Sequence, residues 1–263
     1  MFDRAKIVDD NFLLLIQNGN LPSPKYKLNL SDTNFSSEDL VSVFESQVIS
    51  RHMDLKARAL KNEGKCFYTI GSSGHEGNAV FGKVFQIQDM AFLHYRSAPL
   101  FIERSKKLNG TTPIYDLALS FMASSDDPIS GGRHKVIGSK ELNIPPQTST
   151  IASHLPKAVG TAFSIDHAKG LDISERCLND ESIVICSFGD ASANHASALS
   201  AFNTARLISN QGGHVPIVFI CEDNGLGISV PTQANWIEKN FKNQNNLKYI
   251  KTDGLNLIDL FNK

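Results

Sequence analysis

Two apolar runs decide the fold, Ser182–Phe188 (SIVICSF) and Val215–Cys221 (VPIVFIC). Unbroken apolar runs of this length are typical of strands buried on both faces, and the proline of the second run stands at an edge position, which strands tolerate. The connection 189–214 carries helical spacing over Asn194–Ile208 and is long enough for a crossover between parallel strands. The sequence therefore predicts an α/β fold with a parallel sheet layered between helices.

Apolar spacing elsewhere in the chain predicts further helices. The clearest is Ser37–Asn62, with Gly64 placed to end it. Shorter helical patterns lie at Phe2–Gln17, His75–Phe85, Ala98–Leu108, Pro113–Met122, from Ser153 onwards and at Gly254–Phe261, whereas 124–150 is expected to be irregular. The Asn-, Pro- and Ser-rich stretch 18–37 separates an N-terminal helical arm and linker, 1–36, from a main domain, 37–263. The arm is expected to pack onto a partner or onto the body.

Composition excludes several classes of protein. The 263 residues carry 26 Lys and Arg against 27 Asp and Glu, which argues against a nucleic-acid binder or a polybasic membrane binder. The early apolar run Phe12–Ile16 is shorter than a signal peptide or a membrane helix requires. The four cysteines form no C-x-x-C pair, and Cys186 and Cys221 lie inside the apolar runs, as buried thiols do. We therefore expect a cytoplasmic protein in a reducing compartment.

A polar cluster follows each predicted strand, Gly189–His195 (GDASANH) and Glu222–Gly227 (EDNGLG). Ligands of parallel α/β sheets bind beyond the carboxyl ends of the strands, so Asp190 and Asn224 converge if the two strands are neighbours. A carboxylate and an amide oxygen suit Mg²⁺, and the N–H groups that open the following helix suit a diphosphate. The alternative is that each cluster is only a helix cap or an Asn-Gly turn.

With these clusters in this order, the chain resembles the α subunit, or α-like half, of thiamine-diphosphate-dependent 2-oxo acid dehydrogenases. The thiamine motif of that family is Gly-Asp-Gly, a gap and Asn-Asn, and the matching positions here read Gly189-Asp190-Ala191 and Asp223-Asn224. The resemblance runs from about Val41 to Asp253 and includes Gly64–Glu76 (GKCFYTIGSSGHE), Tyr95-Arg96, Gly132-Arg133 and Thr148–Pro156 (TSTIASHLP). It implies the thiamine-diphosphate-binding fold.

The resemblance implies a cofactor site position by position. The Mg²⁺ ligands would be the side chains of Asp190 and Asn224 and the backbone carbonyl of Leu226. The residues around the diphosphate would be Tyr95, Arg96, Gly189, Ala191 and Ser192.

The same resemblance assigns the loop before the helix that begins near Ser153. Ser149 would meet the aminopyrimidine ring of thiamine diphosphate, and Ile151 would wedge between its two rings. Thr148, Ser153 and His154 match a loop that binds a structural K⁺ ion in some members of the family.

Three departures from the family motif bear on this site. Ala191 replaces the second glycine, which requires a negative φ at that position. Asp223 replaces the first asparagine and adds a negative charge near the metal. The 34 positions between Asp190 and Asn224 exceed the usual gap, and the polar stretch 209–213 is the candidate for a longer loop.

Two histidines are candidate catalytic residues, although a histidine is more often structural. His195 stands at the predicted start of a helix beside the diphosphate, where the helix dipole favours a neutral imidazole. His75 is a candidate for the lining of the substrate channel.

The activity that the resemblance implies is oxidative decarboxylation of a branched-chain 2-oxo acid, such as 2-oxoisovalerate, with acyl transfer to lipoyl groups. The implied partners are a β subunit or β-like domain, which would complete a heterotetramer, and a lipoyl-bearing acyltransferase core. Pyruvate and acetoin dehydrogenase α subunits and a catalytically silent scaffold are the alternatives. Because family α subunits extend further, the chain is expected to be C-terminally truncated or the front of an α–β fusion.

Overall fold

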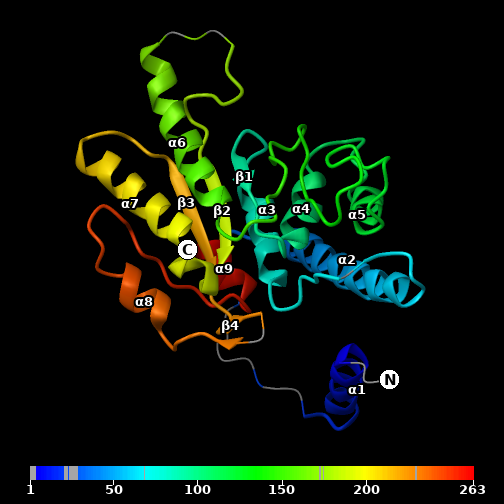
Figure 1. The fold of residues 1–263 in the computed structure, drawn as a ribbon. Helices are drawn as coiled ribbons and strands as arrows, with labels where there is room; N and C mark the ends of the chain where they lie inside the picture. The colour runs from blue at the N-terminus through cyan, green and yellow to red at the C-terminus, as the bar shows by residue number, and fades with distance from the viewer. Residues whose placement is uncertain are drawn as a thin grey trace.

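A computed structural model describes residues 4–20, 23, 29–67, 69–171, 173, 175–228 and 230–263 (Figure 1). Its centre is a parallel sheet of three strands in the order β1-β2-β3, formed by Met90–Phe92, Val184–Gly189 and Ile217–Glu222. The register pairs Val184 with Ile217 and Gly189 with Glu222, so β2 and β3 end level with each other. The two predicted strands are therefore neighbours and run parallel, which confirms the α/β fold.

Helices cover both faces of this sheet because side chains alternate along the strands. Val184, Cys186 and Phe188 of β2 pack with α6 (His154–Gly170) and α7 (Ala196–Asn210). Ile185 points the other way and packs with α4 (Ala98–Ser105), together with α5 (Pro113–Phe121) and α2 (Ser37–Asn62). Figure 1 shows the two helical layers on opposite sides of the strands.

Helix α2 has the bounds that its apolar spacing predicts. At its start the Ser36 hydroxyl accepts a hydrogen bond from the Asp39 backbone, and the Asp39 carboxylate accepts one from the Ser36 backbone. This reciprocal arrangement satisfies N–H groups that the first helical turn leaves unpaired. Just beyond its end, Gly64 adopts a φ of 72°, a conformation that favours glycine.

Several elements differ in their bounds from the sequence prediction. The helix expected to begin at Asn194 begins at Ala196, because Asp190–Asn194 forms a short 3-10 helix, η3, between β2 and α7. The pattern at His75–Phe85 divides into η2 (Glu76–Asn78) and α3 (Ala79–Val84). The terminal pattern becomes α9 (Leu257–Asn262), and α8 (Trp236–Phe241) precedes it. A short hairpin that the sequence analysis missed, β4 (Leu226–Gly227) with β5 (Val230–Pro231), follows β3 directly.

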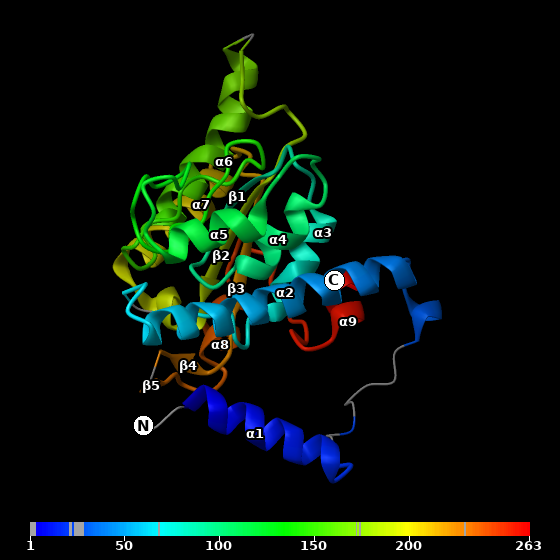
Figure 2. The same cartoon turned by 90° about the vertical axis from the view of Figure 1, so that its right-hand side faces the viewer.

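Helix α1 (Arg4–Gln17) lies outside the layered body in both views (Figures 1 and 2). An ion pair of 3.5 Å joins Asp9 of α1 to Arg51 of α2. The apolar side chains of α1, such as Phe12 and Leu14, are 55% exposed, so α1 does not bury them against the body. Much of the predicted linker falls on residues outside the described ones, and the division at residue 36 stays a prediction. Among the described residues, no helix is long and apolar enough to cross a membrane.

The cap of α2 gives a test of local stability. Ser36→Ala removes the acceptor of the Asp39 N–H hydrogen bond and should lower the free energy of unfolding by about 1 kcal/mol. Ser37→Ala removes a neighbouring exposed hydroxyl that does not cap the helix and should change it by much less. Urea unfolding of both variants measures the difference, and equal losses would contradict the capping role.

Candidate functional site

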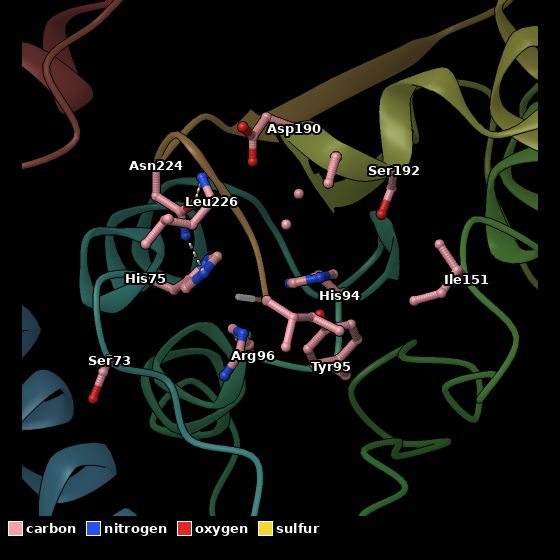
Figure 3. A pocket seen from close by; sticks show the side chains of 14 residues that line it. Ser73, His75, His94, Tyr95, Arg96, Ile151, Asp190, Ser192, Asn224 and Leu226 are labelled. Atoms are coloured by element: carbon pink, nitrogen blue, oxygen red, sulfur yellow. Dashed lines mark hydrogen bonds between the residues drawn. The ribbon is translucent and has the colours of Figure 1, made fainter. Parts of the chain in front are cut away.

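A cavity of about 340 Å³ lies where β2 and β3 end (Figure 3). Its walls come from segments that are far apart in the sequence. The lining residues are Ser73, His75, His94, Tyr95, Arg96, Ile151, Gly189, Asp190, Ala191, Ser192, Asn224, Leu226, Gly227 and Ile228. Ten of the predicted site residues are among them, which leaves Ser149 and His195 to be placed elsewhere. Its position at the carboxyl ends of parallel strands is the usual ligand position in α/β folds.

Asp190 provides the acidic side of the cavity. It follows the last residue of β2, is 2% exposed, and accepts a hydrogen bond from the Thr232 hydroxyl. Partial burial and then the negative charge of Asp190 raise the pKa of Asp223, so two carboxylates of like charge stand close together. A cation bound between the polar clusters would relieve this repulsion.

Asn224 and Leu226 line the same cavity as Asp190, Asn224 from the turn after β3 and Leu226 from the start of β4. The Asn224 Oδ1 accepts a hydrogen bond of 3.0 Å from the Leu226 backbone N–H. The Asn224 Nδ2 lies 3.1 Å from the His75 Nε2, and a dashed line marks this contact in Figure 3. A carboxylate, an amide oxygen and a backbone carbonyl are hard ligands, so the residues present fit Mg²⁺.

The short hairpin holds these candidate ligands together. Thr232, which follows β5, donates its backbone N–H to the Gly225 carbonyl at 2.9 Å and its hydroxyl to Asp190. Gly225 adopts a φ of 74°, as a tight turn after Asn224 requires. The Asn-Gly pair was the sequence signal for this turn, but pairing of such short strands could not be read from the pattern.

Arg96 gives the cavity its positive side. Tyr95 and Arg96 follow β1, so the third strand also contributes its carboxyl end to the site. Arg96 Nη1 donates to the Gly71 carbonyl at 2.6 Å, and the guanidinium lies 5.1 Å from the centre of the Tyr95 ring. A guanidinium held in this way suits a phosphate oxygen, because its N–H groups form a planar fork.

Ala191 is compatible with the backbone at the second glycine position of the motif. It is not among the described non-glycine residues with positive φ, so its methyl group imposes no backbone strain. A Cβ built on Gly227 would lie 3.0 Å from the Ala191 Cβ. The missing side chain at Gly227 therefore makes room for the methyl group of Ala191.

The loop before α6 forms a second, smaller hollow beside the cavity, and Ser149 lines it together with Ile151 and Ser192. The Ser153 hydroxyl donates to Thr148 Oγ1 at 2.7 Å, which closes the loop on itself. His154 Nε2 lies 2.8 Å from the Ser187 carbonyl, and burial lowers the pKa of His154. A neutral His154 that donates this hydrogen bond anchors the loop to β2.

The two candidate histidines have different surroundings. His75 is buried in the cavity wall, with Nδ1 2.7 Å from Glu222 Oε2. His195 is exposed, caps α7 by accepting the Ser197 backbone N–H, and is not among the lining residues. The 3-10 helix η3 separates the start of α7 from Asp190, so His195 stands further along the chain from the strand end than the sequence predicts. Its catalytic role stays a prediction.

The residues of the site that were given no role from the sequence include His94, Glu222 and Thr232. Glu222 is the last residue of β3, and a carboxylate at the end of an apolar strand was the available signal. His94 precedes Tyr95-Arg96 and is buried, and burial lowers the pKa of its imidazole.

The contact of Ala191 with Gly227 gives a test of the site's packing. Gly227→Ala should destabilise the protein by about 1–3 kcal/mol, because the two methyl carbons would crowd each other. Adding Ala191→Gly should recover part of this loss. Gly160→Ala is the control, since no atom lies within 4 Å of a Cβ at this exposed position of α6. Thermal unfolding measures the stability of the single variant, the double variant and the control. A Gly227→Ala variant as stable as the parent would contradict this packing.

The chain is similar in sequence to known proteins along most of its length. The chain is 26% identical to the 2-oxoisovalerate dehydrogenase subunit alpha, mitochondrial, of Caenorhabditis elegans, over 88% of this chain and 50% of that protein. The proteins of the same name from Mus musculus and Homo sapiens are 27% and 28% identical, over 88% and 78% of this chain and 49% and 42% of theirs. The chain thus spans about half the length of these relatives. The family model of the dehydrogenase E1 component matches residues 44–255, and the chain belongs to this family.

Proposed function

We propose that this chain forms the diphosphate-binding half of a thiamine-diphosphate- and Mg²⁺-dependent 2-oxo acid dehydrogenase. One observation carries the proposal: the carboxylate of Asp190, the amide of Asn224 and the backbone of Leu226 line the same cavity as the guanidinium of Arg96. An anion together with a divalent cation matches this distribution of charge. Membership of the dehydrogenase E1 component family supports the same conclusion.

In this proposal Asp190, Asn224 and the Leu226 carbonyl hold Mg²⁺, and Tyr95 and Arg96 bind the diphosphate. Gly189, Ala191 and Ser192 lie against the diphosphate, while Ile151 and Ser149 face the rings from the adjoining hollow. When bound, thiamine diphosphate supplies the electron sink for decarboxylation of a 2-oxo acid. The protein's part is to fix the cofactor and to line the substrate channel, a role assigned here to His75. The Thr148, Ser153 and His154 loop is the proposed site of K⁺.

The proposed substrate is a branched-chain 2-oxo acid, and the proposed product is an acyl group transferred to a lipoyl-bearing acyltransferase core. The names of the relatives, 2-oxoisovalerate dehydrogenase subunit alpha, support this choice of substrate. Pyruvate or acetoin dehydrogenase remains the alternative reaction, since the same diphosphate site would serve it.

A β subunit or β-like domain is the proposed partner, in a heterotetramer. The rim of the cavity is apolar and exposed: Leu226 is 52% exposed, Ile228 78% and Ile151 40%. Burial of this rim against a partner would stabilise the assembly and close the cavity. The four free cysteines support a reducing compartment, and the cytoplasm is the proposed location of the protein. The relatives described above carry the word mitochondrial in their names.

Decarboxylation by the complete protein with its β partner tests the proposal. The assay measures CO₂ release from 2-oxoisovalerate and from pyruvate with thiamine diphosphate, Mg²⁺ and an artificial electron acceptor. Asp190→Ala should abolish release, because it removes the buried carboxylate ligand. Asp180→Ala, at an exposed ion pair with Arg176 before β2, is the matched control and should retain activity. A folded complex that neither binds cofactor nor releases CO₂ would support the scaffold alternative instead.

Residues 1–263 alone should bind thiamine diphosphate weakly or not at all. The cavity opens to solvent beside Ile228, and the proposal assigns its other wall to the partner. Calorimetric titration of this chain with thiamine diphosphate and Mg²⁺ should give heats close to those of buffer. Binding in the micromolar range would show that the cavity is sufficient by itself.

A further inference from the structure

Behind the cavity wall, the carboxylate of Glu222 joins β3 to Asn78 of η2 and to His75, which precedes η2. Its side chain is 11% exposed. Asn78 Nδ2 donates to Glu222 Oε1 at 2.8 Å, and His75 Nδ1 lies 2.7 Å from Oε2. Because Asn78 Nδ2 can only donate, Glu222 Oε1 is an acceptor here, and a carboxylate accepts hydrogen bonds and donates none.

The contact with Glu222 determines how His75 presents its second nitrogen. Because the carboxylate only accepts, the His75 Nδ1 carries a proton and donates it. His75 Nε2 lies 3.1 Å from the Asn224 Nδ2, which can only donate, so Nε2 is the acceptor of that contact. The amide of Asn224 thus turns its NH₂ group to His75 and its Oδ1 away from it.

We propose that Glu222 and His75 are positioning residues that hold the Asn224 amide with its oxygen, and not its nitrogen, toward the metal. This inference rests on the proposed Mg²⁺ site. An amide NH₂ group has no lone pair to offer a cation, so a reversed Asn224 would remove one ligand of three. The Leu226 N–H, which donates to Asn224 Oδ1, favours the same orientation.

The positioning pair is itself anchored in the fold. Asn78 Oδ1 accepts the Leu100 backbone N–H at 2.9 Å, near the start of α4, which fixes the amide that donates to Glu222. A chain of contacts thus runs from α4 through Asn78, Glu222 and His75 to Asn224. Each step has one donor and one acceptor, so a change of acceptor at Glu222 propagates to Asn224.

His75, His94 and Glu222 also form a cluster whose ligand atoms lie within 4.8 Å of one another, which suggests a transition-metal site as the competing explanation. The distances favour a proton between His75 and Glu222. In a tetrahedral zinc site each nitrogen or oxygen ligand lies about 2.0–2.2 Å from the ion. Two such ligand atoms are therefore further from each other than the 2.7 Å that separates His75 Nδ1 from Glu222 Oε2.

The test uses the complete protein with its β partner and Mn²⁺ as a paramagnetic replacement for Mg²⁺. Electron paramagnetic resonance measures Mn²⁺ binding directly at saturating thiamine diphosphate. Glu222→Gln can present an NH₂ group to His75 Nδ1, which moves the imidazole proton to Nε2 and reverses Asn224. We expect metal affinity to fall at least 10-fold, the usual loss when a residue that orients a metal ligand is changed. Unchanged affinity in this variant would overturn the proposal.

Asn224→Asp separates positioning from general damage to the site. A carboxylate offers oxygen in either orientation, so Glu222→Gln should cause little further loss of Mn²⁺ affinity in the Asn224→Asp background. Equal losses in both backgrounds would overturn the proposal. Glu103→Gln is the control for neutralising a buried carboxylate, since Glu103 is 1% exposed and bonds to Ser42 and Ser46 of α2 instead.

Two further results separate this inference from the proposed function. If Asp190→Ala leaves Mn²⁺ binding intact, the metal site itself is wrong and the positioning role falls with it. If Asp190→Ala abolishes binding while Glu222→Gln has no effect, only the positioning role is wrong. Zinc that copurifies with the parent protein and is lost in Glu222→Gln would assign the cluster to a transition metal and overturn the proposal.

Discussion

The parallel pairing of β2 with β3 is the constraint on which the rest of the structure depends. Its register sets Gly189 beside Glu222, so both strands end at one edge and the polar residues that follow them share one cavity. Apolar side chains on both faces of β2 hold this register, because a shift by one residue would turn each of them to the wrong layer. The candidate site is thus a consequence of how the core packs.

The cavity concentrates charges that the fold does not neutralise by itself. Asp190 is buried near Asp223, and the pKa of Asp223 is raised by partial burial and by that neighbour. Arg96 faces the same space from the end of β1. Keeping like charges together costs stability, and a bound cation with an anionic ligand is the arrangement that would recover it.

Two of the three departures from the family motif, Ala191 and the longer connection, fit the structure that surrounds them. Ala191 has its methyl group over Gly227, and neither residue could be larger without crowding the other. The longer connection between the motif halves includes Gly212 and Gly213, which lie between the end of α7 and the start of β3. These changes leave the ends of β2 and β3 level, which is what the cavity requires.

The sequence by itself determined the two long strands, helix α2 to the residue, and the convergence of Asp190 with Asn224, because each follows from local periodicity and strand order. Only the tertiary structure decided that His75 meets Glu222, 147 positions away, and that Arg96 binds the Gly71 carbonyl. It also decided that His195 caps α7 outside the cavity lining. Periodicity records which face of an element is apolar, whereas contacts between elements depend on register and layer order, which no local pattern contains.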